Sequence, residues 1–498
     1  MMHDPGKSDG LVVPAKSSNK AEVEAAETVE GRSPAKGNMG EQNASRTQSR
    51  NQGAPSALDR VRKAAQRDKK LKFTALFHHL SIDLLREAFQ TLHRKASAGV
   101  DGVTWASYEA GLEANLRDLH ARLHRGAYRA KPSRRVYIPK PDGQQRPLGI
   151  AALEDKIVQR AVVEVLNAIY EQDFLGFSYG YRPKRTAHDA LDALNVGLLR
   201  RKVSWVLDAD IRGFFDTIDH GWLMKFVEHR IGDERILRLL RKWLSAGVME
   251  HGSWSLSEKG TPQGAVISPL LANLYLHYAL DLWVQQWRKR PERGEMIVVR
   301  YADDFLVGLQ RYGDAKLFMQ ELRERLLRFS LELHPDKTRL LRFGRFARQQ
   351  RAARQEPNPE TFNFLGFTHI CGENKKGNFT LVRNSIRERM AAKLRALKEE
   401  LMRRRHEPVP KQGAWLGQVV GGYFAYHAVP TNSAALDAFR SQVKRHWKRA
   451  LSRRSQRTRV TWPRMGKLAE RWLPRPLIRH PWPQDRFDAK TQGKSPVR

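Results

Sequence analysis

The chain has 498 residues and carries 89 Lys and Arg side chains against 53 Asp and Glu, so its formal net charge at pH 7 is +36. A charge this large excludes an ordinary near-neutral metabolic enzyme and predicts a polyanionic partner, with nucleic acid ahead of an anionic membrane surface. A hydrophobic content of 41% excludes wholesale disorder, and the single cysteine, Cys371, excludes an intramolecular disulfide or a paired-cysteine zinc site.

The first 57 residues are rich in Ser, Gly, Ala, Asn and Gln and hold almost no large apolar side chains, which predicts a disordered N-terminal tail. No basic stretch leads into an apolar core, as a secretory signal requires. The longest uncharged stretch, residues 260–280, contains Thr261, Gln263 and Asn273 and is too polar to span lipid. The sequence therefore predicts a soluble, cytoplasmic protein without a membrane partner.

Apolar residues at mixed helical and strand spacing run from Leu58 to about residue 375, which predicts a large unit of mixed helix and strand. Residues 376–439 have a helical pattern, with Ile386, Met390 and Leu394 on one face and Lys and Arg on the others. The last segment, 440–498, holds 18 Lys and Arg against three acids, with four tryptophans between them. This composition favours binding to DNA or RNA over a merely solvated basic surface.

The pattern of residues 137–149 predicts a β-hairpin that turns at Asp142 and Gly143, with Lys140 and Arg146 on its arms. Two cations in this position suit the phosphates of a nucleoside triphosphate. By composition alone, the commoner explanation is two solvated charges on a basic protein.

Two apolar strands carry acids at their ends. Residues 203–216 place Asp208 and Asp210 at the end of one run, and residues 296–308 form a predicted hairpin with Asp303 and Asp304 at its tip. Adjacent ionised carboxylates repel one another and need a compensating cation. Mg²⁺ prefers such oxygen ligands together with substrate phosphates, and two such ions support nucleotidyl transfer.

Residues 260–273 combine a flexible turn, one amide side chain, Gln263, and a helix that starts at a proline. Gly264 allows close approach of another backbone or of a ligand. The segment suits contact with a nucleotide, and it is equally explained as a plain cap between a loop and a helix.

The sequence Tyr-Ala-Asp-Asp at residues 301–304 resembles the active-site signature of reverse transcriptases. Further blocks between about Leu71 and Val429 resemble, in order and spacing, the group II intron-encoded reverse transcriptase/maturase family of bacterial type. This resemblance implies an α+β right-hand polymerase with fingers and palm over 58–375, a helical thumb/maturase domain over 376–439 and a basic DNA-binding region over 440–498.

The resemblance assigns roles to particular residues. It implies that Asp210, Asp303 and Asp304 hold two Mg²⁺ ions, with the backbone carbonyl of Ile211 as a further ligand. The residues that the resemblance places at the incoming nucleotide are Lys140, Arg146, Phe215, Gln263 and Lys337.

At Phe215, an aromatic ring under the sugar would clash with a 2′-hydroxyl, so deoxynucleotides are expected. Leu365 and Gly366 match the primer grip, and Arg182 is either a template contact or an ordinary surface arginine.

The implied function is RNA-directed DNA polymerisation that copies group II intron RNA for retrohoming, together with maturase binding of that RNA during splicing. The expected partners are intron RNA, target DNA and deoxynucleoside triphosphates. The sequence leaves open whether the protein forms a homodimer. A bacterial cytoplasmic ribonucleoprotein associated with the nucleoid is expected, without a terminal HNH nuclease module. The alternatives are a retron-like or CRISPR-associated reverse transcriptase and a splicing cofactor without polymerase activity.

Overall fold

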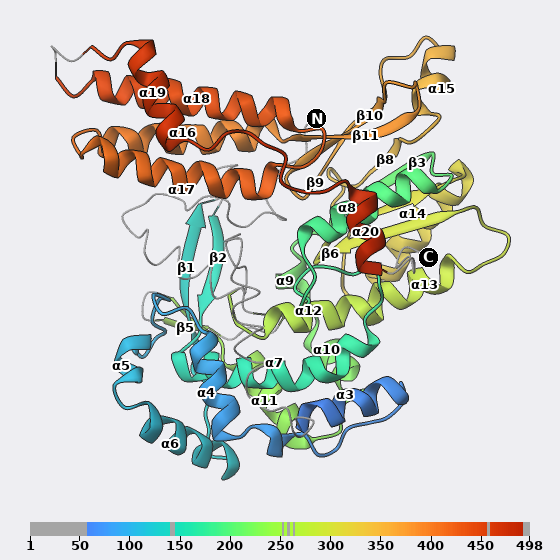
Figure 1. The fold of residues 1–498 in the computed structure, drawn as a ribbon. Coiled ribbons are helices and arrows are strands. Elements are labelled where there is room, and N and C mark those ends of the chain that lie inside the picture. The colour runs from blue at the N-terminus through green and yellow to red at the C-terminus, as the bar shows by residue number, and fades with distance from the viewer. Residues whose placement is uncertain are drawn as a thin grey trace.

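The computed structural model describes residues 57–139, 145–250, 253–255, 259–261, 264–455 and 459–491. The expected N-terminal tail, apart from Ala57, lies outside the described residues. Figure 1 shows three units, with fingers at the lower left, a palm at the right and a thumb across the top. None of the helices in the described ranges is long and apolar enough to cross a membrane.

The finger unit combines helices with a small sheet whose strand order is β2-β1-β4-β5. Strands β1 and β2 form an antiparallel hairpin in which Ile138 pairs with Arg146. The turn of this hairpin, residues 140–144, lies outside the described residues. The elements of the unit are α3 (Ala57–Arg67), α4 (Ile82–Thr91), α5 (Trp105–Glu109), α6 (Leu112–His124), β1 (Ser133–Pro139), β2 (Gln145–Ile150), α7 (Leu153–Asp173), α11 (Glu234–Ser245), β4 (Val248–Glu250) and β5 (Ser253–Ser255).

The palm unit is built on an antiparallel sheet with strand order β6-β7-β3-β8. A π-helical segment, His277–Asp281, joins α12 to α13. The elements of the unit are α8 (Ala187–Arg200), β3 (Trp205–Ala209), α9 (Phe214–Thr217), α10 (His220–Glu228), α12 (Ser268–Leu276), α13 (Leu282–Trp287), β6 (Met296–Tyr301), β7 (Asp304–Leu309), α14 (Tyr312–Leu327), β8 (Arg339–Arg342) and α15 (Ala347–Ala353).

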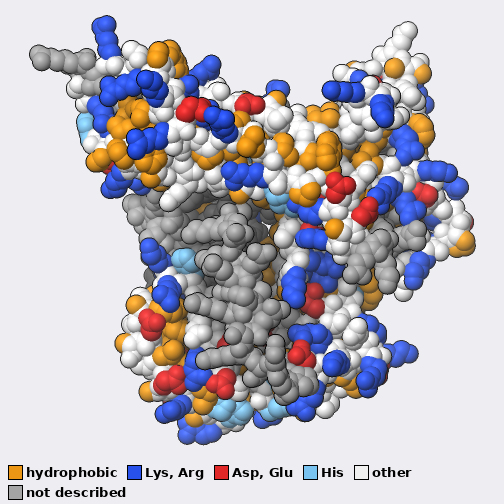
Figure 2. Space-filling view, viewed as in Figure 1, with side chains coloured by type: hydrophobic (Ala, Val, Ile, Leu, Met, Phe, Trp, Pro, Cys, Tyr) orange, Lys and Arg blue, Asp and Glu red, His pale blue; other side chains and the backbone are white. Residues whose placement is uncertain are grey.

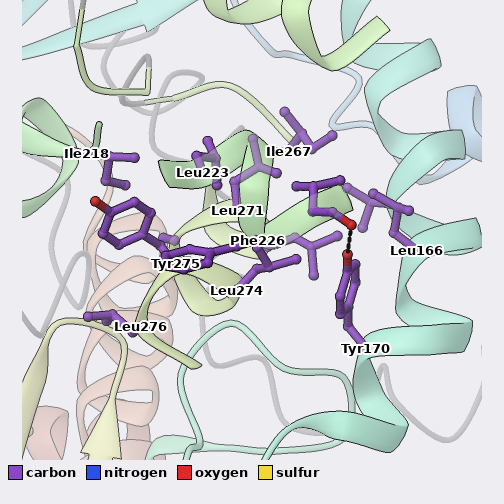
Figure 3. Close-up of a cluster of buried hydrophobic side chains, with 14 of the residues drawn as sticks. Leu166, Tyr170, Ile218, Leu223, Phe226, Ile267, Leu271, Leu274, Tyr275 and Leu276 are labelled. Atoms are coloured by element: carbon purple, nitrogen blue, oxygen red, sulfur yellow. Dashed lines mark hydrogen bonds between the residues drawn. The ribbon is translucent and has the colours of Figure 1, made fainter. Parts of the chain in front are cut away.

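Both faces of the palm sheet are buried. Successive side chains of a strand point to opposite faces, and in β3 they enter two different cores. Leu207 of β3 belongs to the core shared with α7, α10 and α12, whereas Val206 belongs to the core shared with α8. Figure 3 shows how α7 joins the first core, where the Tyr170 hydroxyl donates a hydrogen bond of 3.2 Å to the Val227 carbonyl. The finger and palm units therefore share one continuous core.

A three-stranded sheet with order β11-β10-β9 leads from the palm into the thumb. The elements are β9 (Phe362–Phe364), β10 (Phe367–Glu373), β11 (Phe379–Ser385), α16 (Arg387–Arg403), α17 (Val409–His427), α18 (Ser433–Ser452), α19 (Trp462–Trp472) and α20 (Pro483–Thr491). The expected boundary at residue 375 falls between β10 and β11, and the expected boundary at 439 falls inside α18. The helical core continues past it, because Trp447 is fully buried and donates a hydrogen bond of 3.0 Å from its indole nitrogen to Gln412 Oε1.

The basic C-terminal region divides into an exposed part and a docked part. On α19, the ring of Trp462 is half exposed and lies 4.8 Å from Lys448 Nζ. Figure 2 shows Lys and Arg side chains spread over this end of the thumb, intermixed with hydrophobic atoms. Helix α20, in contrast, returns to the palm and packs on α8, where Phe487 is buried. Part of the segment expected to bind DNA is therefore bound within the chain itself.

Candidate active site

Strands β3 and β7 bring two of the expected metal-binding acids opposite one another. The strands are antiparallel, and Ala209 at the end of β3 pairs with Phe305. If this register is continued by one residue, Asp210, which directly follows β3, falls opposite Asp304, which begins β7. Partners in an antiparallel pair point to the same face of the sheet. The side chains of Asp210 and Asp304 therefore lie on one face, at the end of two neighbouring strands.

The third acid, Asp303, lies in the turn that joins β6 to β7. Tyr301 pairs with Asp304, which leaves Ala302 and Asp303 as a two-residue turn. Ala302 has a φ of +57°, and Asp303 is not among the residues with positive φ. This is the pattern of a type II′ turn, where glycine is the usual first residue. An alanine in this conformation costs about 1–2 kcal/mol, so the turn needs support from its surroundings.

Residues of the segment that precedes β8, on the other side of β3 from β7, contact Asp210. Lys337 Nζ is 3.6 Å from Asp210 Oδ2, and the backbone N–H of His334 donates to the Asp210 carbonyl at 2.8 Å. Arg339 on β8 similarly lies 3.8 Å from Asp208 Oδ2. These cations reduce the repulsion between neighbouring carboxylates. The structure thus places Lys337, expected at the triphosphate, beside the candidate metal ligands.

The backbone of Ile211 is directed toward the hairpin. Ile211 forms an isolated antiparallel bridge with Leu333, and the hydrogen bonds of this bridge are made by the residues on either side of each partner. In a pair of this kind, the N–H and C=O groups of the bridged residue point away from its partner. The Ile211 carbonyl therefore points to the side of β3 where the turn containing Asp303 lies.

The carboxylates at these strand ends fit a divalent cation. Mg²⁺ is commonly held by one or two carboxylates, with water and substrate phosphates as the remaining ligands. Among the residues that the structure describes, no group of three or more His, Cys, Asp or Glu side chains is placed so that it could hold a metal ion by itself. A cation site shared between the acids and a bound nucleotide agrees with both facts.

Phe215 lies on the short helix α9 beside the acids. Phe214 is buried at 2% exposure, whereas Phe215 is only partly buried. The edge of its ring meets Tyr181, with the ring centroids 6.4 Å apart. The backbone carbonyl of Phe215 accepts a hydrogen bond of 2.8 Å from the Thr261 N–H. Phe215 is therefore held in place from two sides while part of its ring remains accessible.

The structure describes only some of the residues expected at the triphosphate. Gly264 packs against the finger hairpin, because a Cβ there would lie 2.8 Å from the Gly149 carbonyl oxygen. Arg146 lies on the same strand as Gly149 and is partly buried. Lys140 and Gln263 lie outside the described residues.

The expected primer grip is the tight turn between β9 and β10. Leu365 and Gly366 have φ values of +45° and +82°. The Leu365 side chain is buried, so the turn can offer only its backbone to a primer. The Leu365 carbonyl accepts a hydrogen bond of 2.9 Å from the Tyr426 hydroxyl of α17. Burial raises the pKa of Tyr426, which keeps this hydroxyl protonated as a donor.

Arg182, one candidate template contact, is buried at 6% exposure. Its guanidinium donates to the Glu171 carboxylate and to the carbonyls of Leu175 and Ser178. The structure therefore supports neither a template contact nor an exposed surface arginine. Arg182 instead fixes the loop that runs alongside β6.

Comparison with known proteins identifies the family. The family described as reverse transcriptase (RNA-dependent DNA polymerase) matches residues 138–369, which include the finger hairpin, the palm sheet and the turn at Leu365. A telomerase from Candida tropicalis shares 13% identity, with a TM-score of 0.38 over 48% of this chain and 53% of that chain.

Two curated relatives are more similar in sequence. Protein YkfC of Escherichia coli K12 is 38% identical over 277 residues, which cover 49% of this chain and 71% of YkfC. Group II intron-encoded protein LtrA of Lactococcus lactis is 35% identical over 242 residues, which cover 47% of this chain and 40% of LtrA. The matched part thus spans less than half of LtrA. The expected fold class and enzyme class are confirmed, and the chain belongs to the family of group II intron-encoded reverse transcriptases and maturases, with the right-hand polymerase architecture.

Proposed function

We propose that this reverse transcriptase copies group II intron RNA into DNA during retrohoming, from a target-DNA primer and deoxynucleoside triphosphates. We also propose that its thumb binds the same RNA as a maturase and assists splicing. The observation that carries the polymerase proposal is the register of the palm sheet, which pairs Ala209 with Phe305 and Tyr301 with Asp304. Continued by one residue, this register supports Asp210 opposite Asp304, with Asp303 in the adjoining turn.

In this proposal, Asp210, Asp303, Asp304 and the Ile211 carbonyl hold two Mg²⁺ ions. When bound, such ions activate the primer 3′-hydroxyl and stabilise the leaving pyrophosphate. The position of Lys337, 3.6 Å from Asp210, supports a contact with the triphosphate next to this site.

The other nucleotide contacts come from separate elements. Lys140, Arg146 and Gln263 complete the triphosphate and base contacts in this proposal. The partly accessible ring of Phe215 supports selection against a 2′-hydroxyl. Leu365 and Gly366 contact the primer through their backbone, since the Leu365 side chain is buried.

The maturase proposal is supported by the intron-encoded relative and by the thumb surface. Lys444 and Lys448 lie 6.0 and 4.8 Å from the ring of Trp462, which is 51% exposed. Lysines around an exposed aromatic ring suit a single-stranded nucleic acid, whose bases stack on rings and whose phosphates attract cations.

The test compares the unaltered protein with Asp303→Asn and Asp304→Asn in two assays: DNA-primer extension on an RNA template with Mg²⁺, and splicing of the host intron. The matched control is Glu332→Gln, an exposed palm acid whose partner is Arg212. Both active-site variants should lose primer extension and retain splicing. Extension by either variant at the control rate would refute the metal assignment.

The same assays distinguish the alternative functions. Splicing assistance without DNA synthesis by the unaltered protein, even with its intron RNA present, would show a splicing cofactor. Synthesis directed only by a short structured RNA, without any effect on intron splicing, would show a retron-like enzyme.

A further inference from the structure

Arg300 is a charged residue in an otherwise apolar strand, and its side chain has no exposed surface. Its guanidinium donates through Nε and Nη2 to the two carboxylate oxygens of Asp281, at 2.8 and 2.5 Å. Nη2 also donates to Ser178 Oγ at 2.7 Å, and Nη1 donates to Asn273 Oδ1 at 3.0 Å and to the Ala302 carbonyl at 2.8 Å. The network thus connects a buried acid, a buried amide and the hairpin turn.

The π-helical segment explains how one helix supplies two of these partners. Asn273 and Asp281 are eight residues apart, and in a regular α-helix, at about 100° per residue, they would point about 80° apart. A π-turn accommodates one extra residue, so the two side chains come to within about 20° of the same direction. The segment His277–Asp281 is this turn. It therefore directs both acceptors toward Arg300.

The hydrogen bond to Ala302 fixes the part of the hairpin that needs support. Ala302 has the left-handed φ of +57° and directly precedes Asp303. The same turn is contacted from the side by Gly180, whose carbonyl accepts a hydrogen bond of 2.7 Å from Asn273 Nδ2. The turn is thus attached through Arg300 and Asn273 to a helix in the core of the palm.

We propose that Arg300 is a positioning residue for the metal-binding carboxylates, and that it acts by tying the Ala302 carbonyl to Asp281 and Asn273. The proposal rests on the proposed function of Asp303. Arg300 contacts neither substrate nor metal in this role, and it fixes the direction in which the turn presents its acid. Groups that orient metal ligands in this way change metal affinity when they are removed.

Removing the buried charge alone would confuse positioning with stability, because Asp281 would remain buried and unpaired. The paired variant Arg300→Met/Asp281→Leu removes both charges and leaves the Ala302 carbonyl without its donor. Arg300→Lys keeps the positive charge but replaces the planar five-donor group by one ammonium. The matched control is Arg293→Met/Asp314→Leu, which removes an ion pair of 3.2 Å between the segment before β6 and the first turn of α14, at the end of β6 away from the turn.

The experiment measures Mn²⁺ binding by electron paramagnetic resonance in complexes with a primer–template duplex, together with the Mg²⁺ dependence of primer extension and the Tm. The paired variant should fold but bind Mn²⁺ about 10–100-fold more weakly than the unaltered protein, as should Arg300→Lys. The control pair should bind Mn²⁺ normally. Unaltered Mn²⁺ affinity in a folded Arg300 variant would overturn the proposal.

If the paired variant does not fold, Arg300→Lys decides the question by the same comparison. Absence of primer extension by the unaltered protein would instead refute the proposed function. The Mn²⁺ affinities test the positioning role separately from that outcome.

Discussion

Gly180→Ala should displace the β6–β7 hairpin, which carries two of the proposed metal-binding acids, without changing either acid. A Cβ at this position would lie 2.3 Å from the Ala302 nitrogen and 2.9 Å from the Tyr301 carbonyl carbon. Ordinary contacts begin at 3.4 Å, so the turn must move by about 1 Å or the loop at Gly180 must retreat. Both neighbouring atoms belong to the backbone, so a side-chain rotation cannot relieve the contact.

The magnitude follows from these distances. Overpacking of this kind costs about 1–3 kcal/mol of stability. A shift of about 1 Å at reacting groups lowers a rate by about 100-fold, which corresponds to about 2.7 kcal/mol in the barrier. The expected outcome is therefore a folded protein with a slightly lower Tm and an incorporation rate reduced by about two orders of magnitude.

The assay is single-nucleotide incorporation from a pre-bound DNA primer on an RNA template, with the Tm measured in parallel. Gly313→Ala is the matched control, because a Cβ at Gly313 on α14 meets nothing within 4 Å. A Gly180→Ala protein that incorporates nucleotides as fast as the control would refute the argument that this glycine fixes the turn.

Three further predictions concern the proposed primer grip, two buried histidines and the C-terminal helix. Tyr426→Phe removes the hydroxyl that donates to the Leu365 carbonyl, so the binding free energy of the primer–template duplex should weaken by about 0.5–1.5 kcal/mol while the rate at saturation is retained. An unchanged Kd in a binding titration would contradict a role of this hydrogen bond in holding the primer. Burial holds the pKa of His369 and of His427 at about 3, whereas an unfolded histidine titrates near 6.5, so below about pH 6.5 the unfolded state binds more protons. The free energy of unfolding should therefore fall as the pH drops through this range, and the Tm at pH 5.5 should lie below the Tm at pH 7.5. Equal Tm values would contradict the lowered pKa of these two histidines. Phe487→Ala removes a buried ring worth about 3–5 kcal/mol, so trypsin should cleave α20 faster while the Tm of the remaining core changes little. Unchanged cleavage would show that the ion pairs of α20 with α8, Arg486 with Asp192 and Asp488 with Arg200, suffice for docking.

The strands and acids of the palm could be predicted from sequence because their signals are local. An apolar run that ends in Asp210 and a hairpin tipped by Asp303 and Asp304 are each visible within about a dozen residues. The register between β3 and β7 is not visible in this way, since it depends on how distant strands pair. That these acids meet around a cation is a hypothesis that the two acid-tipped strands suggest and that the family resemblance supports.

The support of the turn could not be predicted. The signal at Arg300 is a cation within an apolar strand, which indicates a buried partner but does not say which one. Its partner Asp281 lies in a π-helical segment, and neither the apolar spacing nor the turn residues of the sequence indicate that irregularity. The role of Tyr426 was hidden for a related reason, because the pairing of a thumb helix with a palm turn is a tertiary contact.

Composition misplaced the end of the thumb. The high density of Lys and Arg after residue 439 suggested a separate binding segment, but Val443, Trp447 and Leu451 continue the apolar stripe of α18 into the thumb core. The apolar side chains on one face of a helix determine which core the helix joins, whereas the solvated Lys and Arg side chains between them do not.

Because α20 docks on the palm, the thumb is attached to the palm both where the chain enters the thumb and where the chain leaves it. The chain enters the thumb from β11 and leaves it through residues 473–482, where the N–H groups of Arg479 and His480 donate to the Ala428 carbonyl before α20 meets α8. A body joined at one point can swing in any direction, but one joined at two points turns mainly about the line between them. The expected motion of the thumb is therefore a door-like rotation that opens and closes over the duplex without sideways drift.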